Sequence, residues 1–180
     1  MKRAATLLTP AIALLSAVLS SCSLIGPLIK TAAPLAGIKM TFACIPEHTL
    51  VDTPSGPRPV EVLEAGDPVM GFTGRPVRIL QKHCYMESPQ TVFLHITFDG
   101  GASVDLCGMH RVDGIRARDI LVGQVIARRT VTGIESRSGE TRSFDLLTED
   151  AGYQIHGVPV NSMIEEMQRA AVTGMGSVRD

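Results

Sequence analysis

Residues 44–69 decide the fold, and they read CIPEHTLVDTPSGPRPVEVLEAGDPV. After the first cysteine, HTLVDT has the β-branched and partly alternating composition of a strand, and the PSGP that follows is a turn. The continuation predicts a short strand or helical turn, a tight turn at Gly66–Asp67 and another strand. Cys44 therefore stands at the entrance to a β domain, where a thiol can be a buried filler, half of a disulfide, a metal ligand or a nucleophile.

The chain keeps this alternation of short strands and turns as far as residue 162. Turn residues recur at DGG (99–101) and SGETRS (138–143). The longer segments predicted as strands are RPVRILQKHCYM, TVFLHITF, ASVDLCGMHRV and FDLLTED, with two short strands around Gly157. Short strands separated at such regular intervals by turns predict an all-β fold.

A short C-terminal helix is predicted from Ser162 onward. Met163, Met167 and Ala170 fall at helical spacing, and Ser162 with Glu165 suits a capping box.

One pattern occurs twice. Two segments, VEVLEAGDPV (60–69) and the end of IRARDILVGQVI (115–126), share this pattern: a hydrophobic residue, two variable positions, Gly, then Asp or Gln, one variable position, and Val or Ile. Two copies of one pattern predict a pair of β subdomains related by pseudo-two-fold symmetry.

The composition limits the core and the partners. Hydrophobic residues make up 44% of the 180 residues but aromatic ones only 4%, with no Trp, so the core must consist of Val, Ile and Leu. The 17 basic and 18 acidic residues nearly balance. Because no Lys/Arg cluster is longer than two residues, we expect no nucleic-acid partner.

The N-terminus has the composition of an export signal. MKR is followed by the apolar run AATLLTPAIALLSAVLS and then by LSSC (19–22). This ending resembles the lipobox of bacterial lipoproteins, in which the cysteine is lipidated. The resemblance implies a signal peptide over 1–21, lipid attachment at Cys22, and anchoring in the cell envelope, on the periplasmic face or in the outer membrane. An ordinary cleaved signal and an uncleaved anchor are the alternatives.

Residues 22–43 are small, apolar and interrupted by Pro and Gly, so we interpret them as a tether. In an oxidising compartment three cysteines would remain after lipidation, at Cys44, Cys84 and Cys107. An odd number leaves at least one thiol outside any internal bridge. A bridge between Cys84 and Cys107 would leave Cys44 free.

The opening stretch resembles the start of the Hint domain, the self-processing fold that inteins and hedgehog proteins share, and the bacterial hedgehog-type version most of all. The matching positions are Cys44, Thr49, Val51, Ser55–Gly56 and the segment 60–69. The likeness is specific over these residues and continues more loosely to about residue 162. It implies a Hint-type horseshoe of short strands with pseudo-two-fold subdomains over 44–162, and a partly helical tail over 163–180.

The resemblance also implies a reaction. The thiolate of Cys44 would attack the carbonyl of Ala43, turning the Ala43–Cys44 amide into a thioester that an unidentified nucleophile then resolves. The family's Thr-x-x-His block falls on CGMH, so that His110 would protonate the departing nitrogen and Cys107 takes the place of the threonine. In the later FDL block, Asp145 would help to deprotonate the thiol or relay protons. No cofactor is implied.

The chain departs from the family at three places. Cys107 is a poorer hydrogen bonder than a threonine hydroxyl. Ala151 and Gly152 stand where the family has a late histidine, and the terminal His-Asn pair of inteins falls on Asn161–Ser162. Full splicing is therefore not expected, and a degenerate, non-catalytic binding or scaffold lipoprotein is the alternative.

Zinc binding is a rival use of the same residues. Cys44 with His48, His83 with Cys84, and Cys107 with His110 supply the right ligand types. Their spacing is irregular, so we predict no metal. His48, His83, His95 and His156 are expected at the surface or on strands.

Overall fold

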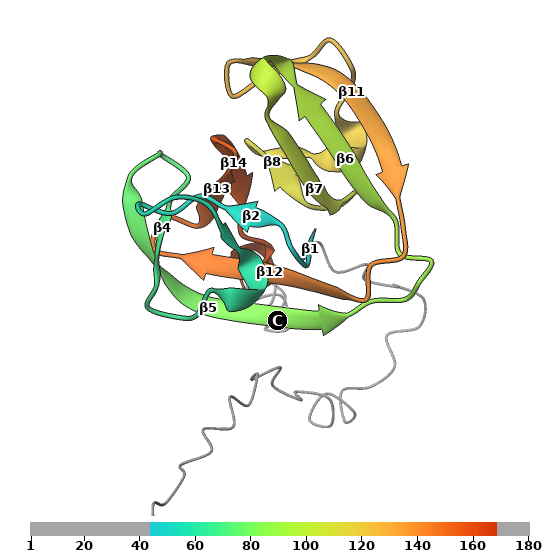
Figure 1. Ribbon diagram of the computed structural model, residues 1–180. Helices are drawn as coiled ribbons and strands as arrows, with labels where there is room; N and C mark the ends of the chain where they lie inside the picture. The colour runs from blue at the N-terminus through green and yellow to red at the C-terminus, as the bar shows by residue number, and fades with distance from the viewer. Residues whose placement is uncertain (1–43, 169–180) are drawn as a thin grey trace, which may run out of the picture. The chain divides into compact units, whose positions relative to one another are not determined.

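The computed structural model describes residues 44–168. The predicted signal peptide, Cys22, the tether with Ala43, and residues 169–180 lie outside this range. Within it, the chain consists of short strands joined by turns, as Figure 1 shows, and the all-β prediction is confirmed. The strands are β1 (Ile45–Pro46), β2 (Leu50–Val51), β3 (Arg58–Pro59), β4 (Pro68–Met70), β5 (Pro76–Met86), β6 (Phe93–Phe98), β7 (Ser103–Cys107), β8 (Arg111–Val112), β9 (Ile115–Arg116), β10 (Val125–Ile126), β11 (Arg129–Arg137), β12 (Arg142–Thr148), β13 (Gly152–Ile155) and β14 (Val158–Asn161). Single turns of 3-10 helix are η1 (Val60–Val62), η2 (Asp99–Gly101) and η3 (Ala117–Asp119).

Two four-stranded sheets of the same construction form the two ends of the molecule. Their strand orders are β1-β12-β5-β4 and β7-β6-β11-β10. In both, the long strands pair across the sequence: β5 pairs with β12 and not with β6, and β11 pairs with β6. Figure 1 shows β5 and β12 at one end and β6, β7 and β11 at the other. The chain thus crosses from one sheet to the other after β5 and returns after β11.

The pseudo-two-fold symmetry extends to individual backbone hydrogen bonds. In the first copy the amide of Thr49 donates to Pro46, and in the second the amide of His110 donates to Cys107. The first residues of the two 3-10 turns also correspond: the amide of Val60 donates to the carbonyl of Thr49 at 2.9 Å, and the amide of Ala117 donates to the carbonyl of His110 at 2.8 Å. The prediction from the repeated pattern is confirmed. Pro46 and Thr49 occupy the same places in the first copy as Cys107 and His110 in the second.

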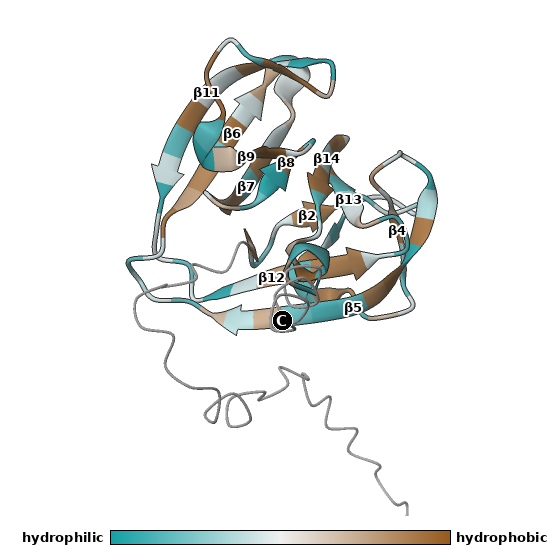
Figure 2. Cartoon of the chain, turned by 180° about the vertical axis from the view of Figure 1, so that it is seen from behind, coloured by the Kyte–Doolittle hydropathy of each residue, from teal (hydrophilic) through white to brown (hydrophobic). Residues whose placement is uncertain are grey.

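The core is mainly aliphatic, as the composition predicts, and it also contains Phe93, Phe98, Phe144 and Tyr153. Ile45, Leu63, Ile96 and Leu106 are completely buried, and Tyr153 is the largest side chain among the fully buried ones. Figure 2 shows both hydrophobic and hydrophilic stretches along β5 and β11. A third sheet has the strand order β13-β14-β8-β9. An isolated antiparallel β-bridge between Gly71 and Tyr153 connects it to the residues that follow β4.

A helix begins at Met163 and continues to the end of the described residues. The predicted capping box is wrong, because the Ser162 hydroxyl is buried with no hydrogen-bond partner in the described part of the chain. Instead, a carboxylate oxygen of Asp145 on β12 accepts the amides of Met163 and Ile164 at 2.7 and 2.8 Å. A carboxylate binds two amides more strongly than a hydroxyl can. Within residues 44–168 no helix has the length and apolar composition needed to cross a membrane.

Candidate active site

Cys44 is buried, 1% exposed, immediately before β1. In the β1–β12 register Ile45 pairs with Phe144 and Pro46 with Ser143, so Cys44 comes next in line with Asp145. Paired residues of an antiparallel sheet point to the same face, and successive residues alternate. Cys44 therefore shares one face of the sheet with Ser143 and Asp145.

The next strand of the sheet extends this face. On β5, Tyr85 pairs with Ser143 and His83 pairs with Asp145. Cys84 pairs with Phe144 and so belongs to the opposite face. None of the cysteines within residues 44–168, which are Cys44, Cys84 and Cys107, is in a disulfide, so the bridge considered between Cys84 and Cys107 is not formed.

Cys107 joins the second subdomain to the predicted nucleophile. Its amide donates to the carbonyl oxygen of Cys44 at 2.9 Å, and its side chain is 1% exposed. The contact fixes the residue that follows the predicted cleavage site. It uses the backbone of Cys107, so the replacement of the family's threonine leaves this particular contact in place.

His110 lies in the turn that begins at Cys107. Its amide donates to the carbonyl of Cys107 at 2.9 Å, its own carbonyl accepts the amide of Ala117 at 2.8 Å, and the side chain is fully buried. The turn is thus held at both ends. One short segment supplies both the amide that holds Cys44 and the predicted acid.

Asp145 is fully buried and engaged on both carboxylate oxygens. One oxygen accepts the amides of Met163 and Ile164 at the start of the C-terminal helix. The other accepts the amide of Leu146 at 2.9 Å and the hydroxyl of Tyr153 at 3.3 Å. Burial raises the pKa of Asp145 to about 7, although all four hydrogen bonds act in the opposite direction. The structure brings Asp145 beside Cys44, and its hydrogen bonds give it a structural role there.

The electrostatic surroundings keep the resting thiol protonated. Burial raises the pKa of Cys44 well above its ordinary value, and the neighbouring Asp145, Cys107 and Glu87 raise it further. A hydrogen bond with Ser143 acts against them. Burial likewise raises the pKa of Cys107 to about 11. Since the thiolate is the nucleophile, attack by Cys44 requires a base.

Sequence reasoning missed three polar residues that face Cys44: Ser143, Glu87 and Tyr85. The hydroxyl of Ser143 donates to a carboxylate oxygen of Glu87. Ser143 precedes Asp145 by two positions on one strand, so the period of two could have revealed it. The positions of Glu87 and Tyr85 depend on the pairing of β5 with β12, for which the sequence carries no local signal.

The positions expected to complete splicing have structural roles. The side-chain oxygen of Asn161 accepts the amide of Gly114 at 2.9 Å, and the amide of Ser162 donates to Ala151 at 2.9 Å. Gly152 lies against Phe72 and the carbonyl of Val160, with no space for a side chain.

The other histidines lie where they were expected, on strands or at the surface. His48 pairs with Glu61, His83 with Tyr85, His95 with Asp105, and His156 with the carbonyl of Ser103. In the residues that the structure describes, no three His, Cys, Asp or Glu side chains converge in the manner of a metal site.

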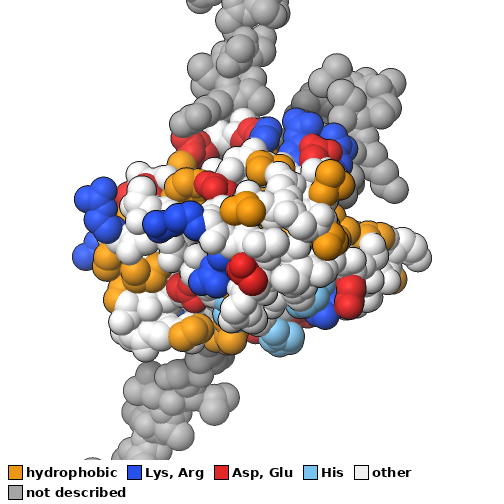
Figure 3. Space-filling view, turned by 90° about the horizontal axis from the view of Figure 1, so that it is seen from above, with side chains coloured by type: hydrophobic (Ala, Val, Ile, Leu, Met, Phe, Trp, Pro, Cys, Tyr) orange, Lys and Arg blue, Asp and Glu red, His pale blue; other side chains and the backbone are white. Residues whose placement is uncertain are grey.

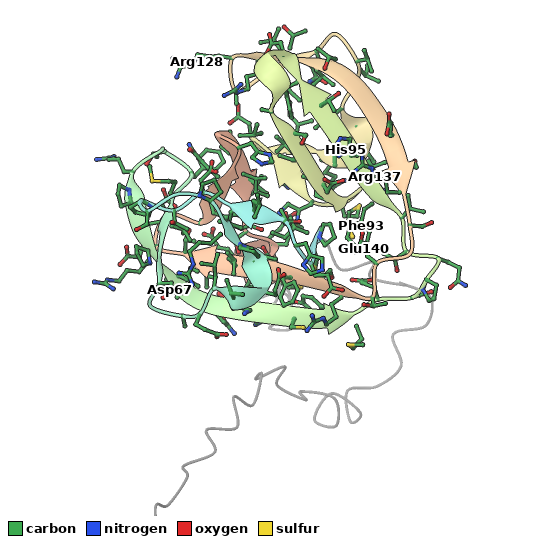
Figure 4. The ribbon with its side chains drawn as sticks, in the orientation of Figure 1. Asp67, Phe93, His95, Arg128, Arg137 and Glu140 are labelled. Atoms are coloured by element: carbon green, nitrogen blue, oxygen red, sulfur yellow. The ribbon has the colours of Figure 1, made fainter. Side chains whose placement is uncertain are left out.

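A depression of about 200 Å³ lies next to the site. Its floor includes Pro46 of β1 and Phe93 of β6, which pairs with Cys107. Figure 4 shows Phe93, His95, Arg137 and Glu140 close together at this end. Besides Pro46 and Phe93, the lining residues are Glu47, His48, Thr49, Asp105, Arg137 and Glu140. Acidic and basic side chains are also interspersed on the face seen in Figure 3.

Solved structures with this fold include inteins and an intein-like domain. The gp41-1 intein superposes with a TM-score of 0.55 at 15% identity, over 68% of this chain and 100% of the intein. The bacterial intein-like domain from Clostridium thermocellum gives 0.57 at 18% identity, over 68% and 100%. The Msm DnaB1 intein splicing domain, solved with zinc, gives 0.56 at 18%, over 66% and 99%. No protein-family model matches the sequence, and no curated protein matches it either. The chain therefore has the Hint fold, with the horseshoe and pseudo-symmetry predicted for it.

Proposed function

We propose that residues 44–162 are a self-processing Hint domain of the bacterial hedgehog type, which converts the Ala43–Cys44 amide into a thioester. One observation carries the proposal. In a fold shared with inteins, Cys44 is the buried residue that opens the first strand, and the amide of Cys107 in the His110 turn holds its carbonyl.

The proposed reaction needs one bond exchange. A base takes the thiol proton of Cys44, and the sulfur forms a bond with the carbonyl carbon of Ala43. The bond from that carbon to the Cys44 nitrogen breaks, and His110 supplies the proton that the nitrogen takes up. The thioester is then open to water, a thiol or another nucleophile. The depression lined by Pro46 and Phe93 is a space from which such a nucleophile could approach.

The proposal extends to the membrane. Lipidation of Cys22 would anchor the chain to a bacterial membrane, and cleavage after Ala43 would separate the anchored peptide, residues 22–43, from the domain. Full splicing is not part of the proposal. Ala151 and Gly152 replace the late histidine, Asn161 stands one place early, at the position of the terminal histidine, and Ser162 replaces the asparagine that cyclises.

A second candidate is a non-catalytic scaffold with the same fold. The observation that favours it is Asp145, whose two carboxylate oxygens accept four hydrogen bonds, two of them from the C-terminal helix. A carboxylate occupied in this way serves the fold whether or not the chain cleaves itself.

Incubation of the full chain with dithiothreitol separates the two candidates. We expect time-dependent cleavage in the wild type and in Cys84→Ala, whose thiol lies on the other face of the sheet, but none in Cys44→Ala. Intact mass spectrometry and gel electrophoresis measure it. Equal behaviour of the wild type and Cys44→Ala would favour the scaffold.

A further inference from the structure

A row of polar side chains leads away from the Cys44 thiol. The thiol shares one face of the β1–β12 pair with Ser143, and the hydroxyl of Ser143 donates to one carboxylate oxygen of Glu87. Ser143 is fully buried, while Glu87 is partly exposed at the end of β5. The three side chains thus connect a buried sulfur to a carboxylate that reaches solvent.

The carboxylate of Glu87 is held in place from two other sides. Its second oxygen accepts the hydroxyl of Thr91 at 3.0 Å, and its amide donates to the carbonyl of Thr141 at 2.9 Å. Glu87 lies where the chain leaves β5 to cross into the second sheet, and Thr141 lies just before the start of β12. The two crossing segments therefore fix Glu87 against Ser143.

The other titratable groups around Cys44 are less suited to accept its proton. From β12 comes Asp145, whose oxygens already accept four hydrogen bonds. Tyr85 of β5 and Tyr153 of β13 face the thiol as hydroxyls whose pKa burial raises, and Cys107 of β7 is itself a buried thiol. His83 of β5 lies on the same face, but both of its ring nitrogens already have hydrogen-bond partners, Gln81 and Tyr85. Glu87 is a carboxylate, is linked through Ser143, and has access to solvent.

We propose that Ser143 and Glu87 form the proton relay that activates Cys44, with Glu87 as the terminal acceptor. This inference rests on the proposed function, since it assigns the base for that reaction. Asp145 then holds the helix and shapes the face on which the thiol lies.

In the first step the Cys44 thiol gives its proton to the Ser143 oxygen while the Ser143 hydroxyl proton passes to Glu87. The resulting thiolate attacks the Ala43 carbonyl carbon, and the Cys44 nitrogen, on leaving, takes its proton from His110. Glu87 ends protonated and returns its proton to solvent.

Self-cleavage of the full chain at saturating dithiothreitol, followed from pH 6 to 9, tests the relay. Glu87→Gln and Ser143→Ala should slow cleavage about 100-fold at pH 7, as the loss of a general base does. The defect should shrink as pH rises, because hydroxide can then take the proton. The conservative variants Glu87→Asp and Ser143→Thr should recover part of the cleavage rate. The control variant Glu135→Gln, at an exposed position of β11, should cleave at the wild-type rate.

A purely electrostatic role for Glu87 predicts the opposite sign. The negative charge of Glu87 raises the pKa of Cys44, so its removal alone should make the thiol more acidic and cleavage faster. A rate in Glu87→Gln that equals or exceeds the wild type at pH 7 would overturn the relay. So would a defect that is the same at every pH, as expected if the variants only disturb the structure.

The S–H stretching band in the Raman spectrum, assigned to Cys44 by its loss in Cys44→Ala, gives a readout that needs no cleavage. We expect it at the lower frequency of a hydrogen-bonded thiol, moving upward in Ser143→Ala. Wild-type cleavage without this shift overturns the relay and leaves the proposed function standing. Absence of wild-type cleavage overturns both, whatever the band does.

Discussion

Asp145 connects the fold to the site through one side chain. The carboxylate caps the C-terminal helix, contacts Tyr153 and lies on the same face as Cys44. Its position beside the thiol fits the role expected from the resemblance, but its hydrogen bonds are those of a structural group. We therefore expect its ionisation to appear mainly in stability.

Stability should depend on pH through Asp145. Its pKa of about 7 in the folded protein lies above the ordinary value of 3.8, so the folded state holds the proton more tightly than the unfolded state. The free energy of unfolding should therefore fall, relative to that of Asp145→Asn, as pH rises from about 4 to about 7. Urea denaturation of both proteins at several pH values measures this. Parallel pH profiles would contradict the assignment.

At the residue scale, the sequence identified Cys44, Cys107 and His110, because each stands in a short motif that a reader can recognise. The structure brings these three to one place through backbone hydrogen bonds. Ser143 and Glu87 belong to no such motif. Their contact depends on two strands that are more than 50 residues apart in the chain, a distance over which composition and periodicity carry no information.

At the element scale, the repeated pattern was sufficient to predict the symmetry. Each of the two segments, around Gly66 and around Gly123, has a 3-10 turn before the glycine and a short strand after it: η1 and β4 in the first, η3 and β10 in the second. The exchange of long strands between the sheets could not be predicted, because β5 and β6 look like neighbours in the sequence. Local propensity fixes the type of an element, whereas pairing depends on the whole core.

The junction between β13 and the residues after β4 should be sensitive to a single methyl group. A Cβ added at Gly152 would lie 2.6 Å from the Val160 carbonyl oxygen and 2.8 Å from the ring of Phe72. Gly152→Ala should therefore lower the free energy of unfolding by about 1–3 kcal/mol, the usual cost of overpacking. Urea denaturation measures the change.

Gly108→Ala is the matched control for this substitution. There the nearest atom would be the Cβ of Arg118 at 3.4 Å, an ordinary contact. Its effect should stay within about 0.5 kcal/mol. Equal losses in the two variants would show that the close packing at Gly152 does not limit stability.

At the scale of the whole molecule, the proposal joins a membrane anchor to a domain that releases itself. Cys22→Ser should move the chain from the membrane fraction to the soluble fraction, because a cysteine is required for lipid attachment. Immunoblots of fractionated cells measure the distribution, with Cys84→Ser as the matched control. Persistence of Cys22→Ser in the membrane would indicate an uncleaved anchor.

The most direct test of self-processing is the identity of the two products that hydroxylamine releases from the full chain. A thioester at the proposed bond predicts one fragment that begins at Cys44 and another that ends in an Ala43 hydroxamate, both of which mass spectrometry can identify. Neither fragment should form from Cys44→Ala. An unchanged mass in the wild type, or fragments that end at any other residue, would contradict the account.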